Sequence, residues 1–191
     1  MRRYNDLNTW LRRRFGERVQ KITIDAGLTC PNRDGTVGTG GCIYCNERGS
    51  GTGKAADMDI TAQLLDGREK LSRRYNAGKF IAYFQSYSNT YAPLDRLERM
   101  YREAAAVEGV VGLAVGTRPD CAGNEVLDLL ADVNSDTWVT LEYGLQSARD
   151  DTLRLINRGH SYAEFEDAVN RSHARGLAVT AHLILGLPGE G

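Results

Sequence analysis

The stretch CPNRDGTVGTGGCIYC at residues 30–45 places three cysteines, Cys30, Cys42 and Cys45, in one glycine-rich segment. The last two form a C-x-x-C pair, and eleven residues separate the first from the second. A structural zinc ion normally has four protein ligands, whereas an iron–sulfur cluster held by three thiolates keeps one iron free to bind another molecule. The stretch therefore predicts a metal centre with one open coordination position.

Zinc, or no metal at all, is the main alternative. A zinc ion would have to take its fourth ligand from a distant histidine, and otherwise the cysteines would remain reduced thiols. The three histidines, at positions 160, 173 and 182, lie far along the chain from the cysteines and are not at ligand spacing. This spacing favours the cluster.

The composition is that of an ordinary globular domain. The 191 residues are 41% hydrophobic and 26% charged, and a net charge of -1 argues against a protein that coats nucleic acid through overall charge. Basic residues nevertheless dominate the first 21 residues, with Arg12, Arg13 and Arg14 in succession. No apolar run is long enough to span a membrane and no signal peptide is visible, so we expect a cytoplasmic protein without disulfides.

Hydrophobic periodicity predicts strands that alternate with helices. Helices are expected at residues 7–15, 60–76, 94–106, 124–133, 150–156 and 162–175. Strands are expected at residues 19–26, 80–85, 110–115, 138–143 and 177–185. This order dictates an α/β fold with parallel strands and right-handed crossovers. We expect a basic helical segment at 1–18 and a core at 19–191 that continues beyond Gly191, because the sequence ends on a strand and a turn.

Polar and glycine-bearing segments follow each expected strand. They are the cysteine segment itself and residues 85–90, 116–120, 144–147 and 185–189. Ligands bind where loops leave the carboxyl ends of parallel strands, both in barrels and in open sheets. We therefore expect these five segments to converge on one binding site.

Five motifs follow one another along the chain in a specific order. They are the cysteine segment with Tyr44 inside its C-x-x-C pair, GTRPD at 116–120, GLQS at 144–147, NRGH at 157–160 and GLPG at 186–189. This set resembles the radical S-adenosylmethionine superfamily, and within it the YhcC/YtqA-like group related to the elongator catalytic subunit. The cysteine spacing is x11 and x2 instead of the usual x3 and x2, and residues 85–90 replace the superfamily's glycine-rich motif. The resemblance implies a partial (βα)6 barrel with parallel strands, here expected to be truncated after strand five.

The resemblance also implies the cofactors. Cys30, Cys42 and Cys45 would ligate a [4Fe–4S] cluster whose free iron binds S-adenosyl-L-methionine, and reductive cleavage of that molecule would yield a 5′-deoxyadenosyl radical. Arg158 would meet the methionine carboxylate, although without the resemblance we would interpret it as a solvated arginine. The other residues expected at the cofactor are Tyr44, Gln85, Ser86, Ser88, Asn89, Thr117, Arg118, Gln146, Ser147 and His182.

Several of these side chains have a structural alternative. Glu142 lies in an apolar strand, so it either points into the barrel as a catalytic candidate or pairs with a helix outside it. Cys121 would either act on the substrate, for example as a hydrogen-atom donor, or remain a buried free thiol. His182 would either contact the ribose of the cofactor or be a satisfied core histidine. Thr117 and Arg118 would either join the site or cap a turn.

The substrate implied by the kinship of this group is a modified uridine in tRNA, with an electron donor such as flavodoxin or ferredoxin. The arginine-rich first helix is consistent with tRNA binding, but such charge runs are also typical of a solvated helix face. Radical chemistry on a small metabolite is one alternative function. A non-catalytic, metal-stapled RNA-binding module is another.

Overall fold

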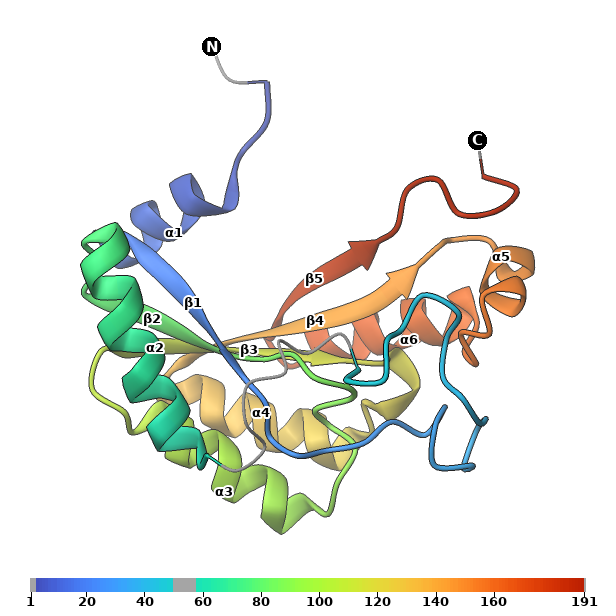
Figure 1. Ribbon diagram of the computed structural model, residues 1–191, viewed down its shortest axis with the longest axis horizontal. Helices are drawn as coiled ribbons and strands as arrows, with labels where there is room; N and C mark the ends of the chain where they lie inside the picture. Colours follow the sequence, from blue (N-terminus) through green and yellow to red (C-terminus); the bar gives the residue numbers. More distant parts are fainter. Residues whose placement is uncertain (1–2, 50–57, 191) are drawn as a thin grey trace.

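The computed structural model describes residues 3–49 and 58–190, which form one open, curved sheet of five parallel strands with helices against it (Figure 1). The strands lie side by side in sequence order: β1 (Val19–Ile24), β2 (Lys79–Phe84), β3 (Val110–Thr117), β4 (Trp138–Gln146) and β5 (Ala178–Leu183). The helices are α1 (Leu7–Phe15), α2 (Ile60–Tyr75), α3 (Leu94–Ala105), α4 (Asn124–Asp136), α5 (Asp150–Leu155) and α6 (Tyr162–His173), with a 3-10 helix η1 at Pro119–Cys121. The connections between strands carry the chain back to the same edge of the sheet, so that all five strands run in parallel. This open, curved parallel sheet is the predicted partial barrel.

The outer face of the sheet carries the main hydrophobic core. Alternate residues of β2, namely Phe80, Ala82 and Phe84, point to this face and are at most 1% exposed. Helix α2 packs on β1, α3 on β3, α4 on β4 and α6 on β5. Each large apolar side chain buried in this layer contributes roughly 1.5–3 kcal/mol to folding. The outer face therefore holds the sheet together and leaves the inner face for a site.

A second, smaller core lies on the inner face at the amino-terminal ends of the strands, where α1 packs. Leu11, Val19, Ile81 and Ala114 form its buried centre, with Trp10, Phe15, Tyr83, Val111 and Trp138 around them. The Trp10 and Trp138 rings lie 5.3 Å apart, and the Arg14 guanidinium lies 5.5 Å from the Trp138 ring centroid. Helix α1 begins where the Asp6 carboxylate accepts the N–H of Thr9 at 2.9 Å. Its packing covers the inner face at this end of the sheet.

The observed elements match the predicted ones to within a few residues, with one correction that affects the site. Segment 144–147, expected as a loop, belongs mostly to β4, which continues to Gln146. Gly144 and Gln146 still pair with β5, and a register shift falls between them. Gln146 has a φ of +74°, so the strand ends on a left-handed residue. In the described part of the chain, no helix has both the length and the apolar character that a membrane span requires.

Candidate functional site

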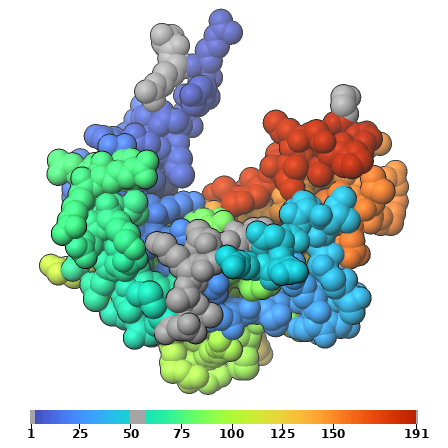
Figure 2. Space-filling model, in the orientation of Figure 1, coloured from blue at the N-terminus to red at the C-terminus, as the bar shows by residue number. Residues whose placement is uncertain are grey.

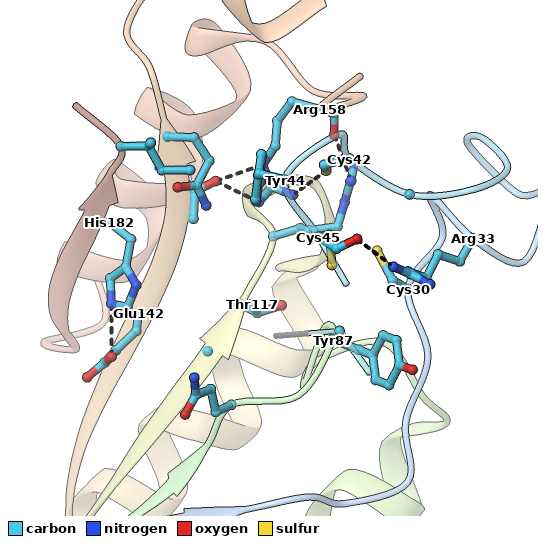
Figure 3. Close-up of a pocket in the computed structure, with 18 of the residues that line it drawn as sticks. Cys30, Arg33, Cys42, Tyr44, Cys45, Tyr87, Thr117, Glu142, Arg158 and His182 are labelled. Carbon is cyan, nitrogen blue, oxygen red and sulfur yellow. Dashed lines mark hydrogen bonds and ion pairs between the residues drawn. The ribbon is translucent and has the colours of Figure 1, made fainter. Parts of the chain in front are cut away.

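A cavity of about 280 Å³ opens on the inner face at the carboxyl-terminal ends of the strands (Figure 3). In the space-filling view, the surface is hollowed between the blue and green side of the molecule and its red C-terminal side (Figure 2). The cavity is lined by Cys30, Arg33, Gly41, Cys42, Tyr44, Cys45, Gly49, Tyr83, Gln85, Tyr87, Gly116, Thr117, Arg118, Glu142, Gly144, Gln146, Arg158, His182 and Ile184. Four of the five segments that the sequence predicted to converge therefore do so. The fifth segment, 185–189, does not line the cavity, although the preceding residue, Ile184, does.

One loop delivers three thiols to this cavity. Cys30, Cys42 and Cys45 all line it, and none of them is in a disulfide. The loop folds back on itself, because the N–H of Gly41 donates to the carbonyl of Asn32 at 2.8 Å. The N–H of Cys45 then donates to the carbonyl of Cys42 at 2.9 Å, which closes the C-x-x-C pair into a turn. The arrangement is a sulfur-only donor set on one cavity wall.

These thiols fit a cluster better than a single metal ion. Around one zinc ion, bonds of about 2.3 Å would bring the sulfur atoms to roughly 4 Å from one another. Within residues 3–49 and 58–190, no three His, Cys, Asp or Glu side chains gather in a way that would hold one ion. In a cluster each thiolate binds a different iron, so three free thiols that share one cavity match its donor set.

The turn at 157–160 holds the cysteine loop from the far end of the fold. The side-chain amide of Asn157 donates to the carbonyl of Gly41 at 2.8 Å. In return, the side-chain amide of Asn32 donates to the carbonyl of Asn157 at 2.6 Å. Asn157 has a φ of +53°, a left-handed conformation that asparagine adopts more readily than most residues. The loop is therefore fixed by side chains on both partners.

Arg158 lines the cavity and is only 6% exposed. Its Nε and Nη2 atoms donate to the carbonyl of Gly144 at 3.0 and 2.6 Å, and its Nη1 lies 3.7 Å from the sulfur of Cys42. A Cβ at position 144 would lie 2.6 Å from Gln146 Nε2 and 2.7 Å from Arg158 Nη2, so a larger residue there would displace these side chains. Arg158 is thus fixed between β4 and the cysteine loop, at a place from which it can reach a ligand in the cavity.

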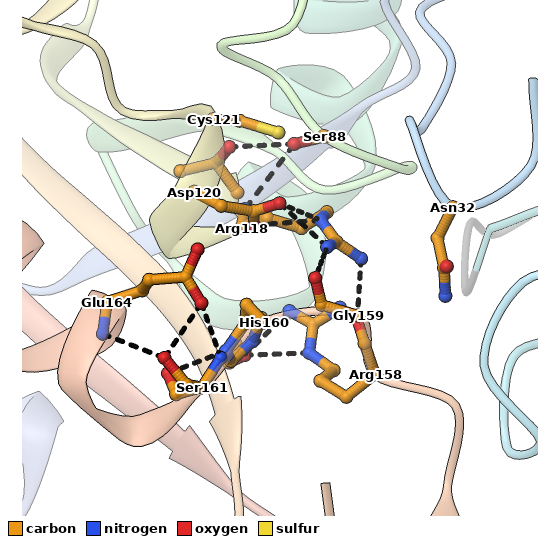
Figure 4. A network of polar contacts seen from close by, with 12 residues as sticks. Asn32, Ser88, Arg118, Asp120, Cys121, Arg158, Gly159, His160, Ser161 and Glu164 are labelled. Atoms are coloured by element: carbon orange, nitrogen blue, oxygen red, sulfur yellow. Dashed lines mark hydrogen bonds and ion pairs between the residues drawn. The ribbon is translucent and has the colours of Figure 1, made fainter. Parts of the chain in front are cut away.

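Arg118 braces the same turn (Figure 4). Its Nε and Nη2 atoms donate to the carboxylate of Asp120 at 3.0 and 2.8 Å, while Nη1 donates to the carbonyl of Arg158 at 2.7 Å. Nη2 also donates to the carbonyl of Gly159 at 3.1 Å. Burial alone would lower the pKa of Arg118, but the Asp120 carboxylate raises it overall. Although Arg118 borders the cavity, its N–H groups are used to hold the backbone.

Only some of the predicted cofactor residues reach the cavity. Those that do are Tyr44, Gln85, Thr117, Arg118, Gln146, Arg158 and His182. Those that do not are Ser86, Ser88, Asn89 and Ser147. The Ser88 hydroxyl lies 2.9 Å from the Thr117 hydroxyl, and the Ser147 hydroxyl donates to the Glu190 carboxylate. These serines join neighbouring loops to one another and do not face the cavity.

Cys121 also lies outside the cavity. It ends η1 and is half-buried. Burial raises the pKa of its thiol to about 12, so the thiol is neutral at pH 7. This placement agrees with the second alternative, a structural free cysteine.

Glu142 points to the inner face, as one of its two alternatives requires. Its side chain is 2% exposed, and its carboxylate accepts hydrogen bonds from Lys21 Nζ and from His182 Nε2, the latter at 3.0 Å. The Lys21 ammonium also lies 4.5 Å from the Tyr83 ring centroid. Burial alone would raise the pKa of Glu142, but the His182 hydrogen bond and the Lys21 charge lower it overall. We call Lys21, Tyr83, Glu142 and His182 the floor cluster.

Sequence reasoning missed Lys21 and Tyr83 as partners of Glu142. A signal existed for Lys21, because it is two residues from the buried Val19 and therefore shares the inner face of β1. Arg33 and Tyr87 were missed too, and they line the cavity with the Arg33 guanidinium 5.7 Å from the Tyr87 ring. No local pattern in the sequence indicates that pair.

Comparison with known proteins gives a family model and several relatives. Residues 32–191 match the model described as Radical SAM superfamily. The chain is 41% identical over 191 residues to the Bacillus subtilis protein YtqA, covering 99% of this chain and 59% of YtqA. It is 44% identical over 182 residues to the Escherichia coli protein YhcC, covering 95% of this chain and 58% of YhcC. The chain thus spans less than two thirds of the length of these relatives.

Two more distant matches are relevant. An 80-residue part of the chain is 34% identical to the tRNA uridine(34) acetyltransferase of Dehalococcoides mccartyi, covering 42% of this chain and 17% of that protein. A solved structure of Methanocaldococcus infernus Elp3 with an N-terminal deletion aligns with a TM-score of 0.62 at 18% identity, covering 90% of this chain and 39% of the other. The structural match confirms the fold.

Proposed function

This chain belongs to the radical SAM superfamily, as its motifs predicted, and we propose that it cleaves S-adenosylmethionine reductively at a [4Fe–4S] cluster held by Cys30, Cys42 and Cys45. The observation that carries this proposal is that three free thiols of one loop share a cavity with the carboxyl ends of parallel strands. When bound, the cluster would supply the electron that breaks a carbon–sulfur bond and leaves a 5′-deoxyadenosyl radical.

The polar side chains between the cysteines and the floor cluster suit the cofactor. Gln85, Gln146 and Arg158 line this part of the cavity and would orient the amino-acid and ribose groups by hydrogen bonds. The planar guanidinium of Arg158 matches a carboxylate in shape and charge. Burial raises the pKa of Tyr44, whose neutral phenol would cover the cysteine loop and exclude water.

The floor cluster is where we place the substrate-facing part of the site. Glu142 is kept ionised by its neighbours, and His182 has a side chain that is 42% exposed. A histidine whose Nε2–H is held by a carboxylate can accept a proton at its other ring nitrogen. This pair would therefore orient a polar substrate group or accept a proton from it.

We propose a uridine of tRNA as the substrate class. The name of the Dehalococcoides mccartyi relative assigns that protein a reaction on a tRNA uridine. Helix α1 adds the exposed side chains of Arg12 and Arg13, which would contact phosphates. A small-metabolite substrate would need no such basic surface.

Anaerobic reconstitution with iron and sulfide tests the chemistry. We expect a brown protein with four irons per chain, as a [4Fe–4S] cluster requires, that releases 5′-deoxyadenosine when given a reductant and S-adenosylmethionine. Cys42→Ala should lose the cluster, whereas Cys121→Ala, the matched cysteine outside the cavity, should retain it. Colourless protein that keeps one zinc per chain would refute the proposal and favour the metal-stapled RNA-binding module.

Binding of tRNA at several salt concentrations tests the substrate class. Removing one arginine that binds a phosphate should reduce the slope of log K against log salt by about 1, so we expect the Arg12→Gln/Arg13→Gln double variant to show a shallower slope. Arg73→Gln/Arg154→Gln removes the same charge from two other exposed helix positions and should leave the slope unchanged. Equal slopes for all three proteins would exclude α1 as the contact surface.

A further inference from the structure

Cys42 has different surroundings from the other two cysteines of the loop. It is 7% exposed, whereas Cys30 and Cys45 are half-buried. Two nitrogen donors from separate parts of the chain approach its sulfur: Asn32 Nδ2 lies 3.5 Å from Sγ and Arg158 Nη1 lies 3.7 Å from it. Both distances are within the range of hydrogen bonds to sulfur, which is a larger atom than oxygen.

Other hydrogen bonds hold each of these donors in place. Asn32 is 1% exposed, and its Nδ2 also donates to the carbonyl of Asn157 at 2.6 Å. An amide nitrogen carries two hydrogens, so one serves Asn157 and the other remains for Cys42. Arg158 is fixed in the same way by its two bonds to Gly144. Neither donor can turn away from the sulfur without breaking one of these hydrogen bonds.

We propose that Asn32 and Arg158 set the reduction potential of the metal centre through N–H···S hydrogen bonds to Cys42. This inference rests on the proposed function, because it concerns the cluster that Cys42 would hold. Reduction adds negative charge to a cluster and its thiolates, so donors on a ligand sulfur stabilise the reduced state and raise the potential. The charge of Arg158 acts in the same direction and is weakly screened in its buried position.

The proposal gives these residues a role that is distinct from binding S-adenosylmethionine. Both would be positioning residues that act through Cys42, and the effect should be present when S-adenosylmethionine is absent. Arg158 retains the option of reaching the cofactor carboxylate, since a guanidinium has five N–H donors. The potential and the cofactor affinity can therefore be measured separately.

An anaerobic redox titration of the reconstituted full chain, followed by electron paramagnetic resonance of the reduced cluster, tests this without added S-adenosylmethionine. For Asn32→Leu and for Arg158→Gln, we expect the ratio of reduced to oxidised cluster at a fixed potential to fall about tenfold, which is 59 mV for a one-electron couple. Arg154→Gln, an exposed arginine paired with Asp151 on α5, is the matched control and should leave the midpoint unchanged.

Two further variants keep the test decisive if a substitution prevents cluster binding. Asn32→Asp keeps the size of the side chain but replaces the donor with a negative acceptor, so its midpoint should fall below that of Asn32→Leu. Arg158→Lys keeps the charge, so its midpoint should lie between those of the wild type and Arg158→Gln. Cluster-loaded variants with the wild-type midpoint would overturn this inference and leave the proposed function standing. A wild-type chain that takes up no cluster would instead refute the proposed function.

Discussion

Lys21→Met tests the electrostatics of the floor cluster. The Glu142 side chain is 2% exposed, so its carboxylate has little contact with water and depends on its protein partners. Lys21 reaches it from β1, across the inner face of the sheet, and supplies both a positive charge and a hydrogen bond. Methionine keeps an unbranched apolar stem of similar length and removes only the ammonium group. The substitution therefore isolates the charge.

The expected loss of stability follows from the burial of the two partners. Removing one partner of a fully buried ion pair costs about 3–5 kcal/mol, because the other charge is left without compensation. The Lys21 side chain is 26% exposed, and His182 still donates to Glu142 in the variant. We therefore expect a smaller loss in the free energy of unfolding, about 2 kcal/mol at pH 7.

Urea unfolding at several pH values measures this loss. The pKa of Glu142 is lower in the folded protein than in the unfolded chain, so its contribution to stability is present above the unfolded pKa and is lost as the pH falls through the folded pKa. Removing Lys21 should raise the folded pKa. The difference between variant and wild type should thus be largest near neutral pH and shrink once Glu142 is protonated in both proteins.

Lys70→Met is the matched control. Lys70 pairs with Asp66 on the surface of α2, with 63% of its side chain exposed, so its loss should change the free energy of unfolding by no more than about 0.5 kcal/mol. Equal urea midpoints for Lys21→Met and the wild type would refute the reasoning. A loss that does not vary with pH would show that it arises from packing and not from charge.

Three further substitutions test the packing around the site. Gly144→Ala places a Cβ 2.6 Å from Gln146 Nε2 and 2.7 Å from Arg158 Nη2, and displacing these two side chains should cost about 1–3 kcal/mol of unfolding free energy. Faster hydrogen exchange in the turn at 157–160 would show that Arg158 has moved. Trp138→Ala should release α1 from the sheet, because the Trp138 ring packs against Trp10. The chain has two tryptophans, so the variant fluoresces from Trp10 alone, and a red shift of that emission would show that Trp10 has become exposed to water. Tyr101→Phe removes the 2.5 Å hydrogen bond from the Tyr101 hydroxyl to the carbonyl of Asn89. Urea unfolding should show a free energy of unfolding that is lower by about 1 kcal/mol.

The strands and helices were readable from the sequence because their signals are local. Buried parallel strands appear as short apolar runs, such as 80–85, and the helices between them have apolar residues at helical spacing. The convergence of strand ends on one cavity followed from the alternation alone, since parallel strands have their carboxyl ends at the same edge.

The pairing of side chains within the site could not be predicted in the same way. Lys21 and Glu142 are 121 positions apart, and no sequence pattern near either residue indicates that they pair. Ser88 and Asn89 were expected at the cofactor because they are polar and follow a strand, but polarity does not distinguish a ligand contact from a bond to the next strand. The side-chain amide of Asn89 donates to the carbonyl of Gly116 at 2.9 Å, so this nitrogen joins the loop to β3.

The hold of the 157–160 turn on the cysteine loop has a consequence for how the protein is made. The bonds that join Asn32 and Gly41 to Asn157 span 125 and 116 positions, so the loop is synthesised long before its partner. At about 5–20 residues per second, the delay on the ribosome is roughly 6–25 s. During that interval the thiols are present without the turn that fixes them. In the proposed metal centre, a cluster loaded so early would meet a Cys42 that still lacks Arg158, so loading should follow synthesis of α5 and the turn at 157–160.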